Sequence, residues 1–100
     1  MRIATWNING LRARIDYVDE WITARDPDLL AFQELKTPTD LFPHEHFERL
    51  GYKSLVNGQK SWNGVAILSK QSIDIEEESN SLHGQEAAGA RFISAQVRTS

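Results

Sequence analysis

The sequence predicts an α/β fold in which about five strands and two helices form one sheet with helices packed on it. Two apolar segments are the first observation. Leu29–Phe32 is a continuous apolar run after Pro27, typical of a strand buried on both faces, and Ile3–Trp6 gives a second short strand. A helical pattern between them is the second observation. Strand, helix and strand in this order predict a right-handed crossover between parallel neighbours.

The helix between these strands is predicted from apolar periodicity. One helical face carries Leu11, Ile15, Val18 and Ile22. We expect the helix to end at Asp26, because Pro27 disfavours the helical conformation in the residue before it.

The second half of the chain alternates between turn signals and short strands. Pro43 suits the first turn of a helix and Gly51 its end, while Asn57-Gly58 is a strong turn signal. In order, we expect a loop at 37–40, a helix at 43–50, strands at 52–56 and 64–68, an edge strand at 73–78, a polar loop at 79–89 and an alternating strand at 90–99.

Length and composition exclude several classes of protein. One hundred residues suffice for one small domain, and 40% hydrophobic with 25% charged residues is typical of a soluble globular chain. The absence of cysteine excludes disulfides, a thiolate nucleophile and a cysteine zinc site. Since the amino terminus lacks the apolar core of a signal peptide and no apolar run is long enough to span a bilayer, we expect a cytoplasmic protein without a membrane partner.

Charge is unevenly distributed along the chain. The net charge of −3 does not by itself indicate a nucleic-acid-binding protein. However, much of the acidic excess is concentrated in residues 74–78. Four basic residues lie within segments 6–14, 32–36 and 58–69: Arg12, Arg14, Lys36 and Lys60. A protein that contacts phosphates at one edge does not need to be basic as a whole.

Two oxygen-bearing side chains follow the first two strands. Asn7 comes directly after Ile3–Trp6, and Glu34 comes where the second apolar run ends. If the strands are parallel neighbours, both side chains emerge at the carboxyl edge of the sheet, where open α/β sheets bind ligands. A carboxylate and an amide oxygen suit Mg²⁺, with water and substrate phosphate completing its shell. The alternative is a solvated Glu34 and an Asn7 that only caps a turn.

Three segments together resemble a known family. These are Trp-Asn-Ile-Asn-Gly-Leu-Arg-Ala-Arg at 6–14, Phe-Gln-Glu-Leu-Lys at 32–36, and Gly-Gln-Lys-Ser-Trp-Asn-Gly-Val-Ala-Ile-Leu-Ser at 58–69. In this order and spacing they resemble the exonuclease III type of apurinic/apyrimidinic (AP) endonuclease. The resemblance implies a DNase I-like four-layer α/β sandwich, classed as α+β in some schemes. Residues 1–100 would be the N-terminal part of a single endonuclease/exonuclease/phosphatase domain, encoding its first sheet and that sheet's helices. The sheet face that should meet the second sheet would then be exposed.

The resemblance also implies an activity. The intact protein would be a metal-dependent DNA repair nuclease that hydrolyses phosphodiesters 5′ of abasic sites and at 3′ ends of duplex DNA. Its cofactor would be Mg²⁺, with Mn²⁺ as a substitute, and the intact protein would be a monomer.

Residue roles are carried over from the resemblance position by position. Glu34 would be the principal metal ligand and Asn7 would complete that side. Asn9, where some family members have Asp, and Lys36 would support the ligands, Lys36 by pairing with site carboxylates or a phosphate. The expected DNA-backbone contacts are Arg12, Lys60, Trp62 and Asn63. For Arg12 and Lys36 the alternative is an ordinary solvated surface position, and for Trp62 the alternative is that it simply covers the sheet edge.

The histidines do not form a recognisable site. His44-Glu45-His46 is not the His-Glu-x-x-His of zinc proteases, and two residues two apart on a helix do not face each other. We therefore expect surface positions for both histidines, and His83 in its polar loop has no better support.

Residues needed for the complete chemistry are missing. Phosphodiester hydrolysis needs a nucleophile positioner and a charge stabiliser besides the metal. In the family a Tyr, Asp, Asn and His past residue 100 fill these roles, so we expect these 100 residues alone to be inactive. The alternatives are another phosphodiesterase of the same superfold, acting on phosphoinositides or sphingomyelin, and a non-catalytic binding fragment.

Overall fold

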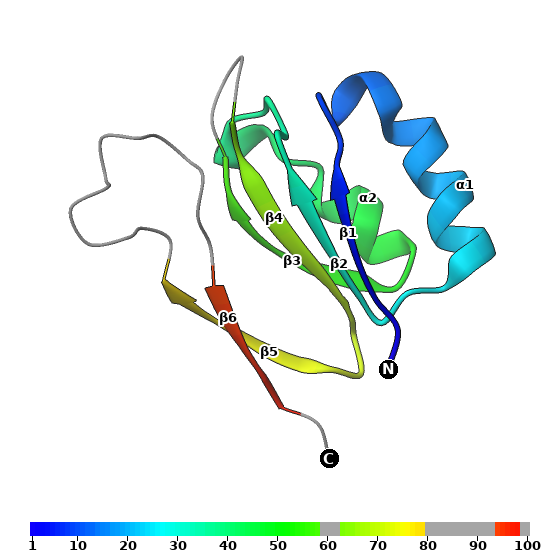
Figure 1. Ribbon diagram of the computed structural model, residues 1–100, viewed down its shortest axis with the longest axis vertical. Helices are drawn as coiled ribbons and strands as arrows, with labels where there is room; N and C mark the ends of the chain where they lie inside the picture. Colours follow the sequence, from blue (N-terminus) through cyan, green and yellow to red (C-terminus); the bar gives the residue numbers. More distant parts are fainter. Residues whose placement is uncertain (59–62, 80–93, 99–100) are drawn as a thin grey trace.

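A four-stranded mixed sheet forms the centre of the protein (Figure 1). The computed structural model describes residues 1–58, 63–79 and 94–98. The strands lie in the order β1 (Ile3–Asn7), β2 (Leu29–Gln33), β4 (Val65–Lys70) and β3 (Tyr52–Asn57). β1 and β2 are parallel, whereas β4 is antiparallel to both of its neighbours. The predicted α/β class and the parallel pairing of the first two strands are confirmed.

The first helical segment connects β1 to β2. It begins with a 3-10 turn, η1 (Arg12–Arg14), and continues as α1 (Ile15–Arg25). Asp26 ends it in the left-handed conformation, with φ of 48°, and donates its backbone N–H to the Ile22 carbonyl at 2.8 Å. The predicted helix and its end before Pro27 are therefore both found.

The second helical segment lies between β2 and β3. Part of the predicted loop at 37–40 is a 3-10 turn, η2 (Thr39–Leu41), and the predicted helix is α2 (His44–Arg49). Phe47 is the buried residue of α2, and its ring lies 6.3 Å from Phe32 of β2 and 5.6 Å from Phe42.

The core lies between the sheet and these helices. Leu30 and Phe32 of β2, together with Leu68 of β4, are no more than 1% exposed. They belong to one buried cluster with Val18 and Ile22 of α1. This cluster anchors α1 and α2 to the same face of the sheet.

The opposite face of the sheet is only partly covered. Ile3 is 67% exposed, and Ala31, Leu55 and Ile67 are half-buried. These residues alternate with those that face the core, because successive side chains of a strand point to opposite faces. This side of the sheet therefore presents apolar area to solvent across all four strands.

The last two described strands correct one prediction. β5 (Asp74–Ser79) pairs with β6 (Ser94–Arg98) in a separate antiparallel two-stranded sheet. The prediction of a single sheet with residues 73–78 at its edge was wrong. Alternation identifies a strand but carries no information about which strand pairs with it. The predicted loop at 79–89 lies almost entirely outside the described residues, and so do residues 90–93 and 99 of the last predicted strand.

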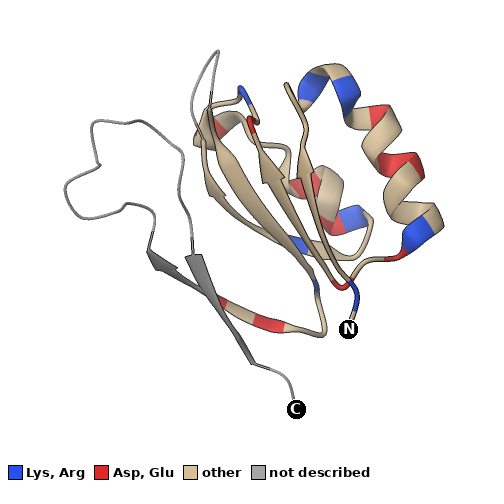
Figure 2. Ribbon diagram, in the orientation of Figure 1, with Lys and Arg blue, Asp and Glu red and all other residues tan. Residues whose placement is uncertain are grey.

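The amino ends of β1 and β2 are held by a cluster of charges (Figure 2). Asp28 accepts the Arg2 backbone N–H at 2.6 Å, which lowers the pKa of its carboxyl. Lys70 Nζ lies 2.9 Å from Asp26 Oδ2 and 3.6 Å from Asp28 Oδ1, and the hydrogen bond to Asp26 raises the pKa of Lys70. Burial raises the pKa of Tyr52, whose hydroxyl donates to the Pro27 carbonyl at 2.5 Å. The strand ends opposite the candidate site thus carry a structural anchor.

No helix in the described part of the chain is both long and apolar enough to cross a membrane.

Candidate functional site

Asn7 and Glu34 emerge at one edge of the sheet. The parallel register pairs Asn7 with Gln33, so Glu34 is the next residue beyond that pair. The Ile8 backbone N–H donates to the Gln33 carbonyl at 2.9 Å and continues the ladder past the strand ends. Asn7 is exposed and Glu34 is half-buried. The structure therefore brings the two predicted metal-binding residues to the same edge.

Three connecting segments are locked together at this edge. The segment after β1 donates to the segment after β2, through Gly10 N–H to the Glu34 carbonyl and Leu11 N–H to the Leu35 carbonyl, both at 2.9 Å. The segment after β2 donates to the segment before β4, through Leu35 N–H to the Gly64 carbonyl at 3.0 Å and Lys36 N–H to the Asn63 carbonyl at 2.9 Å. Glu34 is thus fixed between two neighbouring chain segments.

The backbone at this edge adopts left-handed conformations. Among the described residues at this edge, four other than glycine have positive φ: Asn9 at 49°, Glu34 at 55°, Lys36 at 55° and Asn63 at 59°. Glycine and asparagine reach this region most readily. At Glu34 it ends the extended pleat of β2, so this side chain no longer follows the alternation of the strand.

Asn9 is the centre of a polar network. Lys36 Nζ donates to Asn9 Oδ1 at 2.6 Å, and Arg14 Nη1 donates to the Asn9 carbonyl at 2.7 Å. The predicted supporting residues Asn9 and Lys36 are thus in contact, although Lys36 holds an amide and not a carboxylate. The role of Arg14 was missed, because nothing in the sequence indicates that its side chain returns to a carbonyl five residues earlier.

The donor set at this edge fits a magnesium-like ion. In the described part of the chain, the Glu34 carboxylate makes no hydrogen bond or ion pair. Together with the Asn7 amide it offers oxygen ligands only, and no group of three or more His, Cys, Asp or Glu residues gathers among the described residues. One carboxylate and one amide suit Mg²⁺, which keeps several waters and takes substrate oxygens. They do not suit a tetrahedral zinc site.

The predicted DNA contacts are only partly described. Arg12 is exposed in η1, directly after Gly10 and Leu11, which bond to the segment after β2. Asn63 is half-buried, and its carbonyl accepts the Lys36 N–H. Lys60 and Trp62 lie outside the described residues. The DNA contacts of all four residues remain predictions.

The described histidines have structural partners away from this edge. His46 Nε2 lies 2.7 Å from Asp19 Oδ1 and links α2 to α1. His44 packs edge-on against Phe42, with ring centres 5.0 Å apart. Both are half-buried, where simple surface positions were expected. His83 lies outside the described residues.

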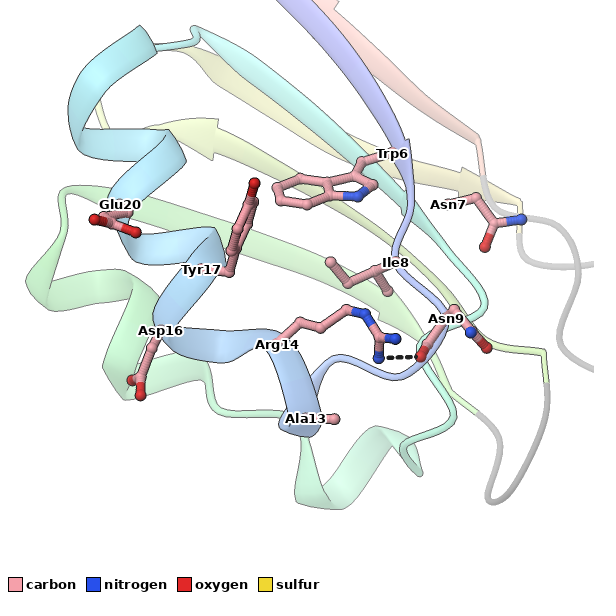
Figure 3. Close-up of a pocket in the computed structure, with 9 residues that line it drawn as sticks. All are labelled: Trp6, Asn7, Ile8, Asn9, Ala13, Arg14, Asp16, Tyr17 and Glu20. Atoms are coloured by element: carbon pink, nitrogen blue, oxygen red, sulfur yellow. Dashed lines mark hydrogen bonds between the residues drawn. The ribbon is translucent and has the colours of Figure 1, made fainter.

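A pocket of about 510 Å³ opens beside the same edge, between the end of β1 and the beginning of α1 (Figure 3). Its aromatic walls are Trp6 and Tyr17, whose rings meet edge to face at 6.1 Å. Arg14 and Asn9 lie at one end of it. No pattern in the sequence indicates this pocket, because the two rings lie on different elements.

Comparisons with known proteins identify relatives of this chain. A sequence model described as the Endonuclease/Exonuclease/phosphatase family matches residues 4–95. Exodeoxyribonuclease III of Haemophilus influenzae is 44% identical over 71 residues, which cover 71% of this chain and 27% of that protein. DNA-(apurinic or apyrimidinic site) endonuclease 2 of Xenopus laevis is 31% identical over 87 residues, covering 84% of this chain and 17% of that protein.

Solved structures of an exonuclease and an AP endonuclease are also similar to this chain. The 3′-5′ exonuclease NExo of Neisseria meningitidis has a TM-score of 0.82 and 36% identity, covering 97% of this chain and 38% of that chain. An AP endonuclease of Archaeoglobus fulgidus has a TM-score of 0.80 and 36% identity, covering 97% and 37%. The chain thus spans well under half the length of these relatives. Because the family match covers nearly every residue, the chain belongs to the endonuclease/exonuclease/phosphatase family.

Proposed function

We propose that this chain supplies one side of the metal-binding centre of a DNA repair nuclease. The observation that carries the proposal is the parallel register that brings Asn7 and Glu34 to one sheet edge. The Glu34 carboxylate has no described partner there. A half-buried carboxylate without a protein partner is available to bind a cation.

Glu34 and Asn7 would hold a divalent cation, Mg²⁺ or in its place Mn²⁺. Such an ion supplies polarisation of the scissile phosphate and stabilisation of the leaving oxygen. Lys36 and Arg14 both donate to Asn9 and so position the bend at this residue, the Asn9 turn. This bend fixes the end of β1 against β2. Asn9 and Lys36 therefore support the metal ligands.

The proposed substrate is duplex DNA, cut 5′ of abasic sites and at 3′ ends. Support comes from the names of the relatives, exodeoxyribonuclease III and AP endonucleases, and from a Neisseria 3′ phosphatase NExo structure bound to a product DNA hairpin. Arg12, Lys60, Trp62 and Asn63 would contact the DNA backbone. The active protein would be a cytoplasmic monomer, in which residues 1–100 form the N-terminal part of one domain.

Cleavage requires more than this edge. Orienting a water and stabilising charge at the phosphate are separate tasks from binding the ion, and losing such groups commonly costs orders of magnitude in rate. Among the described residues, no group of three or more His, Cys, Asp or Glu side chains gathers at this edge. We therefore propose that other parts of the domain supply these groups and that residues 1–100 alone leave abasic DNA intact.

Metal binding can be tested directly on this chain. Free Mn²⁺ would be measured by electron paramagnetic resonance during a titration. Glu34→Gln keeps the size of the side chain and removes its charge, so we expect at least a tenfold weaker affinity (about 1.4 kcal/mol). Glu45→Gln is the matched control, because Glu45 is an 86% exposed carboxylate on α2. Equal Mn²⁺ affinity in the Glu34 variant and the native protein would refute the assignment.

Substrate class needs a catalytic test. Residues 1–100 would replace the aligned part of the Neisseria meningitidis exonuclease, whose structure matches 97% of this chain. We expect the chimera to cleave abasic duplex DNA and its Glu34→Gln variant to lose that activity while keeping the same melting temperature. A folded chimera that hydrolyses a phosphoinositide but not abasic DNA would assign the chain to another branch of the superfold.

A further inference from the structure

We propose that the pocket between β1 and α1 binds one nucleotide of a DNA strand, with the base against Trp6 and Tyr17 and the phosphate at Arg14. This inference rests on the proposed nuclease function and adds a subsite to it. The pocket holds about 510 Å³, which is within the range of small-ligand sites (roughly 300–1,000 Å³) and suits a single nucleotide.

The walls of the pocket suit a flat ring. Tyr17 is 65% exposed, although aromatic side chains are usually more buried. Its ring meets Trp6 edge to face, and Trp6 is backed by Trp21 at 5.7 Å and Phe32 at 6.3 Å. This backing holds Trp6 in place, so the aromatic surface exists before any ligand binds. Nucleobases stack on exposed aromatic rings of this kind with little dependence on sequence.

Charged side chains in the pocket define the orientation of the bound nucleotide. Figure 3 shows Arg14 reaching toward Asn9, and its hydrogen bond to the Asn9 carbonyl fixes the guanidinium at that end. Only one guanidinium nitrogen is used in that bond, so the remaining N–H groups can contact a phosphate. Asp16 and Glu20 line the pocket farther along α1. They repel an anion there and can accept hydrogen bonds from the amino group of a base.

The pocket adjoins the candidate metal edge. Asn7, Ile8 and Asn9 line it through consecutive positions at the end of β1. In Figure 3 the Asn7 side chain points away from the rings of Trp6 and Tyr17. The metal edge and the pocket therefore lie on different sides of the same short segment. A strand crossing this turn would place neighbouring nucleotides on the two sides.

The test is a titration of the 100-residue chain with three probes: dAMP, deoxyadenosine and deoxyribose 5-phosphate. The readouts are the Trp6 indole N–H signal by NMR and, at low protein concentration, tryptophan fluorescence. We expect dAMP to bind more tightly than either part of it. Tyr17→Ala should weaken dAMP binding about tenfold, while Tyr17→Phe, which keeps the ring, should restore it. Arg14→Ala should reduce dAMP affinity to that of deoxyadenosine.

Arg49→Ala is the matched control, because Arg49 is a 76% exposed cation on α2 and should leave every affinity unchanged. Unchanged dAMP affinity in Tyr17→Ala, or equal binding of dAMP and deoxyribose 5-phosphate, would overturn the subsite. Glu34→Gln should lose Mn²⁺ and still bind dAMP. Failure of the subsite is therefore distinguishable from failure of the metal assignment.

Discussion

Gly58→Ala should destabilise the protein strongly, because a methyl group has no space at this position. A Cβ on Gly58 would lie 2.4 Å from the Thr37 carbonyl oxygen, 2.4 Å from the Thr39 nitrogen and 2.7 Å from the Pro38 carbonyl carbon. Ordinary contact begins near 3.4 Å, so about 1 Å must be gained against three backbone atoms. The Gly58 N–H also donates to Thr39 Oγ1 at 2.7 Å, and this bond would be stretched by any shift.

The expected cost is about 3 kcal/mol, the upper end for overpacking, because backbone cannot move aside as a flexible side chain can. For a domain of this size that cost corresponds to a melting temperature lower by about 15 °C. Gly51→Ala is the control: its φ is +92°, but no atom lies within 4 Å of the added Cβ. Only conformational strain of about 1 kcal/mol remains, or about 5 °C. Both shifts would be measured by far-UV circular dichroism, and equal stability of the two variants would refute the packing at Gly58.

Three further predictions concern the candidate site, the cluster of charges at the amino ends of β1 and β2 (the charge anchor), and the partly covered face of the sheet (the open face). Gly10→Ala, with φ of +97° at Gly10, should cost about as much stability as Gly51→Ala, since contacts to its Cβ begin only at 3.8 Å. Unlike Gly51→Ala it should weaken Mn²⁺ binding, and equal Mn²⁺ affinity in the two variants would contradict the role of the Asn9 turn. The lowered pKa of Asp28 stabilises the fold above its usual value of 3.8, and that contribution is lost as pH falls through the lowered pKa. Acid unfolding followed by fluorescence should therefore be less steep in Asp28→Asn, whereas an unchanged profile would remove Asp28 from the anchor. The native chain should bind a hydrophobic fluorescent dye and Ile3→Asn should bind less of it, while absence of dye binding would show that the open face is covered in solution.

Much of the fold could be predicted because burial leaves a pattern in the sequence. The apolar run at Leu29–Phe32 and the helical face that includes Val18 are both found in the core. The pairing of β5 with β6 could not be predicted, since alternation specifies a face and not a partner. Asn7 and Glu34 could be placed at one edge because parallel strands end together.

Other parts of the site left no signal in the sequence. Arg14 contacts Asn9 through a backbone carbonyl, and every residue has one. The left-handed conformation at Glu34 and Lys36 was equally hidden, because neither residue type is associated with it. It arises from the hydrogen bonds that the neighbouring segments impose on this stretch.

The left-handed conformation at Glu34 and Lys36 lowers the stability of the fold, and relieving it would require replacing residues of the candidate site. Glu34 and Lys36 each occupy a region that costs an ordinary residue roughly 1–2 kcal/mol, whereas Asn9 and Asn63 occupy it at lower cost. Gly or Asn at position 34 or 36 would relieve the backbone and remove a carboxylate or an ammonium group. A library of variants selected only for thermal stability should therefore drift toward Gly and Asn at these two positions. The same library selected for metal binding should keep Glu34 and accept the lower stability.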